Sequence, residues 1–211
     1  MTFSIIAFDP EAEMIGSAVA SKWTGVGACV PFFRPGVGMV NIQNFSYAQV
    51  AYRVLDEMEK GEDPAACVEK ALGTDTARNA RQCILATLQG GLFAYSGAKC
   101  SGTFHHLLGK DCVAAGNTLA DRAVVTAMVE SFASTKGLML ADRLITALEA
   151  GQAKGGDARG QEAAAVKVFK YSYPVQRFYP IDLRVDHHDA PLAELRRLYG
   201  IFGENERRVV E

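Results

Sequence analysis

The sequence predicts an α+β domain in which two stacked β-sheets lie between outer layers of helices. Two observations lead to this class. Helical patterns occur in pairs between groups of strand patterns, whereas a doubly wound parallel sheet alternates one helix with each strand. Several strand patterns are also apolar at both odd and even positions, which is typical of strands buried on both faces. Such strands need cover on both sides, and two sheets with helices outside each provide it.

The first part of the chain reads as strands joined by polar turns. Residues 3–8 (FSIIAF) and 14–21 (MIGSAVAS) form a predicted hairpin around the polar segment 9–13. The register of this hairpin places Ser21 opposite Thr2. Two further strands are expected at 26–33 and 37–43, on either side of an Arg-Pro-Gly turn signal.

The rest of the chain alternates between helical and strand patterns. Apolar residues at helical spacing predict a helix over 47–58 that ends at Gly61, and Asp63-Pro64 opens a shorter helix with Asp as its N-cap. The remaining expectations, in chain order, are strands within 81–115, a helix from Thr118, a helix over 138–148 with Gly151 as its stop, a glycine-rich loop at 155–160, strands at 162–169 and 182–186, a helix over 191–199 and a polar tail from about 200 to 211.

Length and composition exclude several classes of protein. The 211 residues fit one domain or two small ones, and because no linker is evident we expect a single domain over 1–211. With 22 Lys+Arg against 24 Asp+Glu, no basic excess supports a nucleic-acid partner. No apolar stretch approaches the roughly 20 residues of a membrane span. Five cysteines without a CxxC pair, and an N-terminus without a basic region, favour free thiols in a cytoplasmic protein.

Five segments together resemble a known family. They are TFSIIAFDP at the start, GVG followed by NIQN, VAAGN, the loop GGDARGQEAA and DLRVD near the end. In this order and spacing they resemble the bacterial and archaeal family of unknown function numbered 1028, from Thr2 to about Tyr199. That family is similar to N-terminal nucleophile hydrolases, so the resemblance implies a four-layer αββα sandwich. The loop departs from the family pattern at Ala158, Glu162 and Ala163, which weakens the case for a polar substrate contact from 162 or 163.

The resemblance makes Thr2 the candidate nucleophile. In N-terminal nucleophile hydrolases the side chain of the first mature residue attacks an amide, and its own α-amine is the base. A free α-amine has a pKa of about 7.7–8.0, so a useful fraction is neutral at pH 7. Met1 is an initiator residue of the kind normally removed before a small side chain. In the alternative interpretation, Thr2 merely favours a strand, and retention of Met1 leaves an amide in place of the amine.

Other candidate site residues follow from their places at strand ends and in one loop. Ser21 and Lys22 lie where Thr2 would act, and Lys22 could hold an oxyanion or lower the pKa of the nucleophile; the alternative is an exposed lysine. Asn117 is the candidate oxyanion donor, or else a turn residue. The candidate substrate-binding residues are Gln43 and Asn44 after the fourth strand and Asp157 and Arg159 in the glycine-rich loop, with turn caps and a local ion pair as the alternatives.

The histidines give little support to a metal site. His105 and His106 are neighbours in a predicted strand and point to opposite faces. The run 186–189 (DHHD) carries ligands that suit Mn or Zn and resembles the signature of DHH phosphoesterases, but the Asp-rich motifs that precede it in those enzymes are missing. We expect a polar turn at 186–189, no metal and no cofactor.

The sequence thus predicts an amide-bond hydrolase of the N-terminal nucleophile type that acts on a small-molecule or peptide-like substrate. The alternative is a non-catalytic binding or scaffold protein on the same fold. The segment 171–185 suggests association into a homo-oligomer, because it reads as an extended arm rich in large apolar side chains; the alternative is an arm that packs on its own domain. These side chains are Tyr171, Tyr173, Val175, Phe178, Tyr179 and Ile181.

Overall fold

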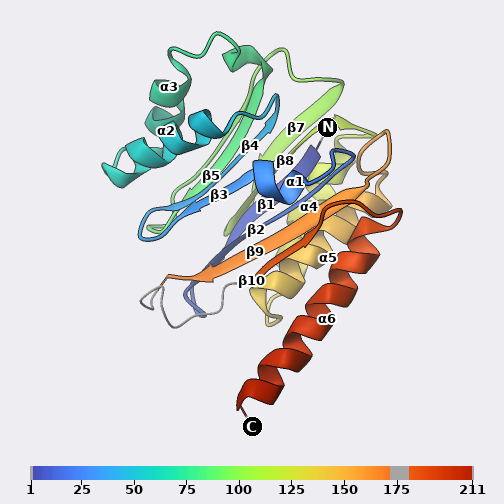
Figure 1. Cartoon of the computed structure of the whole chain (residues 1–211). Coiled ribbons are helices and arrows are strands. Elements are labelled where there is room, and N and C mark those ends of the chain that lie inside the picture. The colour runs from blue at the N-terminus through green and yellow to red at the C-terminus, as the bar shows by residue number, and fades with distance from the viewer. Residues whose placement is uncertain (1, 172–180, 211) are drawn as a thin grey trace.

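Two antiparallel sheets pack face to face in the computed structural model, which describes residues 2–171 and 181–210, with side chains as far as residue 204 (Figure 1). Within these residues the larger sheet has the strand order β10-β9-β2-β1-β8-β7, and the smaller has the order β3-β4-β5-β6. The strands of the larger sheet are β1 (Thr2–Asp9), β2 (Met14–Ser21), β7 (Thr103–Leu108), β8 (Cys112–Leu119), β9 (Ala163–Lys170) and β10 (Ile181–Val185). Those of the smaller sheet are β3 (Pro31–Arg34), β4 (Gly38–Asn44), β5 (Arg81–Thr87) and β6 (Leu92–Ser96).

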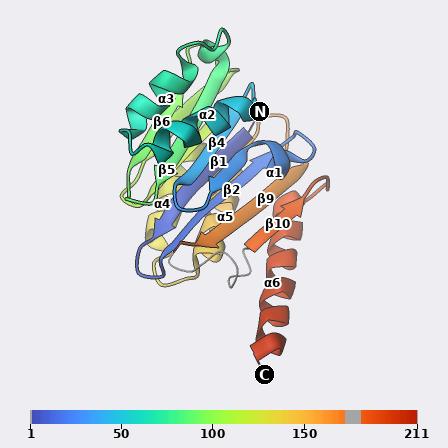
Figure 2. The same cartoon turned by 60° about the vertical axis from the view of Figure 1, so that its left-hand side comes forward.

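Helices lie on the outer face of each sheet (Figure 2). The larger sheet is covered by α4 (Ala123–Ser134) and α5 (Leu140–Ala153) and flanked by α6 (Pro191–Val210), whose C-terminal part extends beyond the sheets in both views. The smaller sheet is covered by α2 (Ala48–Glu59) and α3 (Pro64–Leu72), and the chain between them and β5 contains the short 3₁₀ helix Arg78–Ala80. The expected α+β class, with two sheets and several helices, is therefore confirmed.

Strand β1 shows why some strands are apolar at both odd and even positions. Phe3 and Ile5 are fully buried against the outer helices α4 and α5, while Ile6 and Phe8 pack against the smaller sheet. Successive strand residues point to opposite faces, so a central strand between two layers is buried on both. The same argument holds for β8, where Ala114 faces the helices and Ala115 the other sheet.

The space between the sheets changes character along its length. One end, which we call the polar end, contains Thr2, Ser4, Gln43, Gln82 and Asn117, all at most 5% exposed. The other, the apolar end, contains Ile6, Phe8, Ile15, Met39 and Ile84. Along β1 the side chains that face this space read Thr2, Ser4, Ile6 and Phe8, so the change takes place within one strand.

The segment 26–33 was expected to be a strand, and this expectation is wrong in its first half. Residues Val26–Cys29 form the short helix α1, and the strand β3 begins only at Pro31. Helix α1 covers β2 and β9 beyond the edge of the smaller sheet, where Val26 is buried with Val19 and Ala165. A side chain at Gly27 would meet Ala165, with its Cβ 2.5 Å from that of Ala165. Tertiary packing thus overrides the local strand preference.

Two helix boundaries also differ from the expectation. Strand β8 continues to Leu119, and helix α4 begins at Ala123 rather than at Thr118; the Ala123 backbone N–H donates to Asp121 Oδ1 at 2.6 Å. Gly151 does not stop helix α5, which continues to Ala153. A Cβ at position 151 would lie 2.9 Å from Met128 Cγ, so this glycine permits the close approach of α5 to α4.

The helix, the tail and the arm expected in the C-terminal part of the chain have different outcomes. The helix expected over 191–199 is present but continues to Val210, so residues 200–210 are helical rather than a tail. Strand β10 takes up the end of the proposed arm, and Tyr171 packs at the apolar end. The arm residues Tyr173, Val175, Phe178 and Tyr179 lie outside the described residues.

No helix in the described residues is long and apolar enough to cross a bilayer. All five cysteines lie in the described part and carry free thiols; Cys29 is half-buried and the other four are buried.

Candidate functional site

Three neighbouring strands bring Thr2, Ser21 and Asn117 side by side. The register pairs Thr2 with Ser21 on β2 and with Asn117 on β8, which confirms the predicted position of Ser21. The Thr2 hydroxyl donates to Ser21 Oγ at 3.3 Å, and Ser21 Oγ also accepts from the Trp23 backbone N–H at 3.0 Å. Thr2 is 5% exposed and the other two are fully buried. A hydroxyl pair therefore lies at the polar end, next to a buried amide side chain.

Gln82 connects this group to the smaller sheet. Its Oε1 accepts from Gln43 Nε2 at 2.8 Å and from Asn117 Nδ2 at 3.1 Å. Its Nε2 donates to the Gly116 carbonyl at 3.0 Å and to Ser96 Oγ at 2.8 Å. Because a carbonyl only accepts, this contact fixes which way the Gln82 amide points, and Gln82 in turn fixes Gln43 and Asn117.

The fixed orientation leaves one acceptor without a partner. Asn117 Oδ1 is buried, and the described residues give it no hydrogen bond. On Gln43 the equivalent oxygen accepts from Ser4 Oγ at 2.7 Å. An unsatisfied buried acceptor costs about 1–3 kcal/mol, so Asn117 Oδ1 is suited to a donor that binds beside Thr2.

A cavity of about 230 Å³ opens beside Thr2. Gln43 and Asn44 line it together with residues of the chain after β2 and after β4. The complete lining is Thr2, Trp23, Val26, Cys29, Val30, Gln43, Asn44, Phe45 and Ser46. The cavity thus lies directly beside the nucleophile candidate.

Asn44 supports the wall of this cavity. Its backbone adopts a left-handed conformation with φ of 70°, which asparagine tolerates better than most residues. The side chain donates to the Ala80 carbonyl at 2.6 Å and accepts from the Ser101 backbone N–H at 3.0 Å. It therefore holds three chain segments together, and its own hydrogen-bonding groups are occupied.

Lys22, Asp157 and Arg159 form a separate group that does not line the cavity. Lys22 Nζ is paired with Glu162 Oε1 at 2.6 Å, and this hydrogen bond holds the pKa of Glu162 below its ordinary value. The buried Asp157 carboxylate accepts from the backbone N–H groups of Lys22 at 3.2 Å and Arg159 at 2.9 Å. Asp157 thus ties the chain after β2 to the glycine-rich loop.

The histidine-containing run forms a turn. Asp186 pairs with Arg184 at 2.8 Å, and His188 Nδ1 accepts from the Ala190 backbone N–H at 2.9 Å. No group of three or more His, Cys, Asp or Glu side chains in the described residues is arranged to hold a metal ion.

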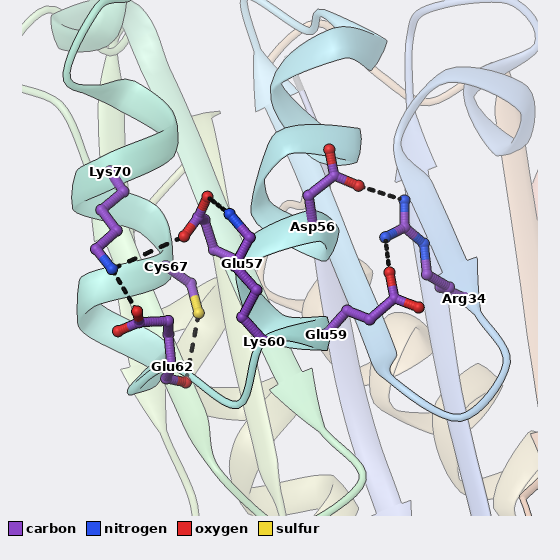
Figure 3. A network of polar contacts seen from close by, with 8 residues as sticks. All are labelled: Arg34, Asp56, Glu57, Glu59, Lys60, Glu62, Cys67 and Lys70. Carbon is purple, nitrogen blue, oxygen red and sulfur yellow. Dashed lines mark hydrogen bonds and ion pairs between the residues drawn. The ribbon is translucent and has the colours of Figure 1, made fainter.

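An ion-pair network on the outer helices is the other prominent polar region (Figure 3). Arg34 contacts Asp56 at 2.8 Å and Glu59 at 2.9 Å, and the Glu57–Lys60 pair lies at the C-terminal end of α2. Most of these side chains are well exposed, and exposed pairs contribute about 0–1 kcal/mol each. None of them lines the cavity beside Thr2, so we assign this network to the surface of α2 and α3.

Gln82 and Phe45 are not among the residues predicted from the sequence, and Trp23, a side chain that could either pack or line a pocket, borders the cavity. The sequence does carry a signal for Gln82. In the buried strand β5 the side chains of Gln82, Ile84 and Ala86 share one face, and Gln82 is the polar one of the three. Trp23 and Phe45 lie in loops, where no periodicity marks a side chain that borders a cavity.

The fold and the site define an α+β protein with two antiparallel sheets and a buried polar group at one end of the space between them. The chain belongs to the family of unknown function DUF1028, whose model matches residues 2–195. It is similar to the crystal structure of protein SPO2555 from Silicibacter pomeroyi, a structure assigned to the same family. The identity is 31%, the match covers 94% of this chain and 88% of the other, and the TM-score is 0.84.

A second solved structure has a much lower similarity. Anbu, an ancestral β-subunit from Yersinia bercovieri, matches with 10% identity over 98% of this chain and 96% of its own, at a TM-score of 0.45. Among curated proteins, none matches the sequence.

Proposed function

We propose that the protein hydrolyses an amide bond, with Thr2 as the nucleophile and its free α-amine as the base once Met1 has been removed. The observation that carries this proposal is the position of the Thr2 hydroxyl, which is nearly buried, bonded to Ser21 and next to a cavity. On this proposal the two sheets and their outer helices are the four-layer αββα sandwich of N-terminal nucleophile hydrolases.

The proposed reaction has two steps. In the first, the α-amine takes the proton of the Thr2 hydroxyl as its oxygen attacks the substrate carbonyl carbon. The C–N bond then breaks, the proton passes to the departing amine, and the acyl group stays on Thr2 as an ester. In the second, water attacks the ester carbonyl and gives its proton to the α-amine. The acid leaves, and the proton returns to the Thr2 oxygen.

Asn117 receives a different role from the one expected from the sequence. Its amide N–H₂ already donates to Gln82, whereas its buried Oδ1 has no partner in the described residues. The α-amine of Thr2, on the directly paired position of β1, is a donor that suits this acceptor. We therefore assign Asn117 to the orientation of the amine rather than to the oxyanion. Ser21 orients the Thr2 hydroxyl.

The remaining candidate residues either line the substrate cavity or hold the loops next to it in position. Gln43 and Asn44 belong to the substrate cavity. Lys22, Asp157 and Arg159 are positioning residues, because Lys22 is paired with Glu162 and Asp157 holds the loops together.

The test combines intact mass with a substrate screen. We expect complete loss of Met1 in protein from native-like expression, and turnover of some member of a panel of N-acyl amino acids, asparagine derivatives and peptidoglycan fragments. Thr2→Ala should abolish this turnover and Thr2→Ser should retain part of it. Met1 retained in full, together with no turnover, contradicts the proposal and favours a non-catalytic binding protein.

A further inference from the structure

The cavity beside Thr2 is mainly apolar. Five of the nine residues that line it are Trp23, Val26, Cys29, Val30 and Phe45. Its volume of about 230 Å³ lies below the roughly 300 Å³ at which pockets for drug-sized ligands begin. The space therefore suits a single ring or a short branched chain, held by apolar contact.

The polar side chains of the lining are already satisfied by the protein. Both ends of the Gln43 amide are hydrogen-bonded, to Ser4 and Gln82, and both ends of the Asn44 amide are hydrogen-bonded as well. Ser46 Oγ donates to the Cys29 carbonyl at 2.6 Å. A ligand in the cavity would therefore meet polar chemistry mainly where its reacting group reaches Thr2.

Charge is also absent from the lining in the described residues. The guanidinium carbon of Arg81 lies 5.0 Å from the centre of the Phe45 ring, which borders the cavity. Arg81 is paired with Asp75 at 2.8 Å, however, and both side chains are less than 10% exposed. Lys22 is paired with Glu162. A charged group brought into the cavity would lose water without gaining an unpaired counter-ion, and that costs several kcal/mol.

Two aromatic side chains border the cavity and remain open to solvent. Trp23 is 69% exposed and Phe45 is 62% exposed. The Phe45 carbonyl accepts a hydrogen bond from Arg81, which fixes this residue, and the Trp23 backbone donates to Ser21. Both aromatic rings thus extend from backbone that the site holds in place, and their exposed faces can cover an apolar ligand.

We propose that the cavity binds the acyl part of small amides of apolar carboxylic acids, aromatic or branched; this inference rests on the proposed function. The acyl half is the one assigned to the cavity because it stays bonded to Thr2 after the amine has left. It therefore needs a site adjoining Thr2, whereas the amine has to leave for solvent.

Binding can be measured separately from hydrolysis, because Trp23 is the single tryptophan of the chain and borders the cavity. We would titrate the Thr2→Ala variant with 3-phenylpropanamide, 3-methylbutanamide, acetamide and succinamate, and follow tryptophan fluorescence. The two apolar amides should bind at least tenfold more tightly than acetamide or succinamate. Phe45→Ala should weaken their binding at least fivefold. Tyr52→Ala, a matched change of an exposed aromatic residue outside the lining, should leave it unchanged.

The wild-type protein is then assayed for ammonia release from the same four amides. Tight binding of the apolar amides without release supports the ligand class and counts against the hydrolase. Faster release from succinamate than from 3-phenylpropanamide supports the hydrolase and overturns the ligand class. Fluorescence that responds to none of the apolar amides up to their solubility limit also overturns the ligand class, whatever the outcome for hydrolysis.

Discussion

The two ends of the space between the sheets are built from the same strands but filled with opposite chemistry. At the apolar end Ile6, Met39 and Ile84 pack in one cluster of buried apolar side chains. At the polar end Gln82 and Asn117 are equally buried, but they are held by a chain of hydrogen bonds that leaves Asn117 Oδ1 unsatisfied. A protein that needed only stability would gain by filling both ends with apolar side chains. On the proposed function, the polar end is kept for chemistry, at some cost in stability.

The largest loss of stability is expected from the apolar end. Ile6→Ala removes a fully buried side chain between the two sheets and leaves a cavity there, so it should lower the free energy of unfolding by about 2–5 kcal/mol. Urea unfolding followed by circular dichroism measures this. Any hydrolytic activity at 25 °C should stay close to that of the wild type. A loss below 1 kcal/mol would show that the apolar end is not a tightly packed core.

Gln82→Leu should change both stability and activity. It leaves the buried amide groups of Gln43 and Asn117 without their acceptor, at an expected cost of about 1–3 kcal/mol. Turnover should fall at least tenfold, because Asn117 is no longer oriented. The control is Ser17→Ala with Asn41→Leu, which removes both members of a buried pair at once. Equal turnover in control and test variant would contradict the role of Gln82.

The ion pair of Arg81 with Asp75, next to Phe45 at the cavity, gives a prediction about how stability depends on pH. Its hydrogen bond to Arg81 lowers the pKa of Asp75, so the pair stabilises the folded state above the ordinary aspartate pKa of about 3.9. That contribution is lost as the pH falls through the lowered value. Asp75→Asn should therefore cost about 1–2 kcal/mol at pH 7 and progressively less towards pH 3. Urea unfolding at several pH values measures it, and a difference independent of pH would argue against the pair.

The smallest effect on stability is expected at the site itself. Thr2→Ala removes one hydrogen bond, to Ser21, at the end of a strand, so it should cost only about 1 kcal/mol. Any amide hydrolysis should nevertheless be abolished. The measurement pairs thermal unfolding with turnover, and activity within twofold of the wild type would remove Thr2 from the mechanism.

Much of the fold follows from local patterns. The hairpin of β1 and β2 and the helices α2 and α3 could be predicted because periodicity, turn residues and the Asp63 cap agree there. Helix α1 could not, because its sequence is compatible with a strand and only the uncovered face of β2 and β9 selects a helix. The close approach at Gly151 likewise depends on a partner helix that the local sequence does not reveal.

The part of the site that could be predicted from the sequence is the part that depends on strand pairing within one hairpin. Register alone places Ser21 beside Thr2. The contact of Gln82 with Asn117 joins strands of different sheets, and no sequence spacing encodes how two sheets face each other. Lys22 was a candidate to act on Thr2, with an exposed lysine as the alternative. Its partner is Glu162, which is distant in sequence and is brought close by the pairing of β2 with β9.

The central claim is that Thr2, with a free amine, forms an ester with the acyl group of its substrate. Intact-mass and peptide-mapping mass spectrometry of protein quenched in acid during turnover of 3-phenylpropanamide, or of any substrate that the screen finds, tests it most directly. The account predicts a chain that begins at Thr2 and carries one acyl group on that residue, and no such adduct in Thr2→Ala. Turnover by a chain that still begins with Met1, or an adduct on another residue, would contradict it.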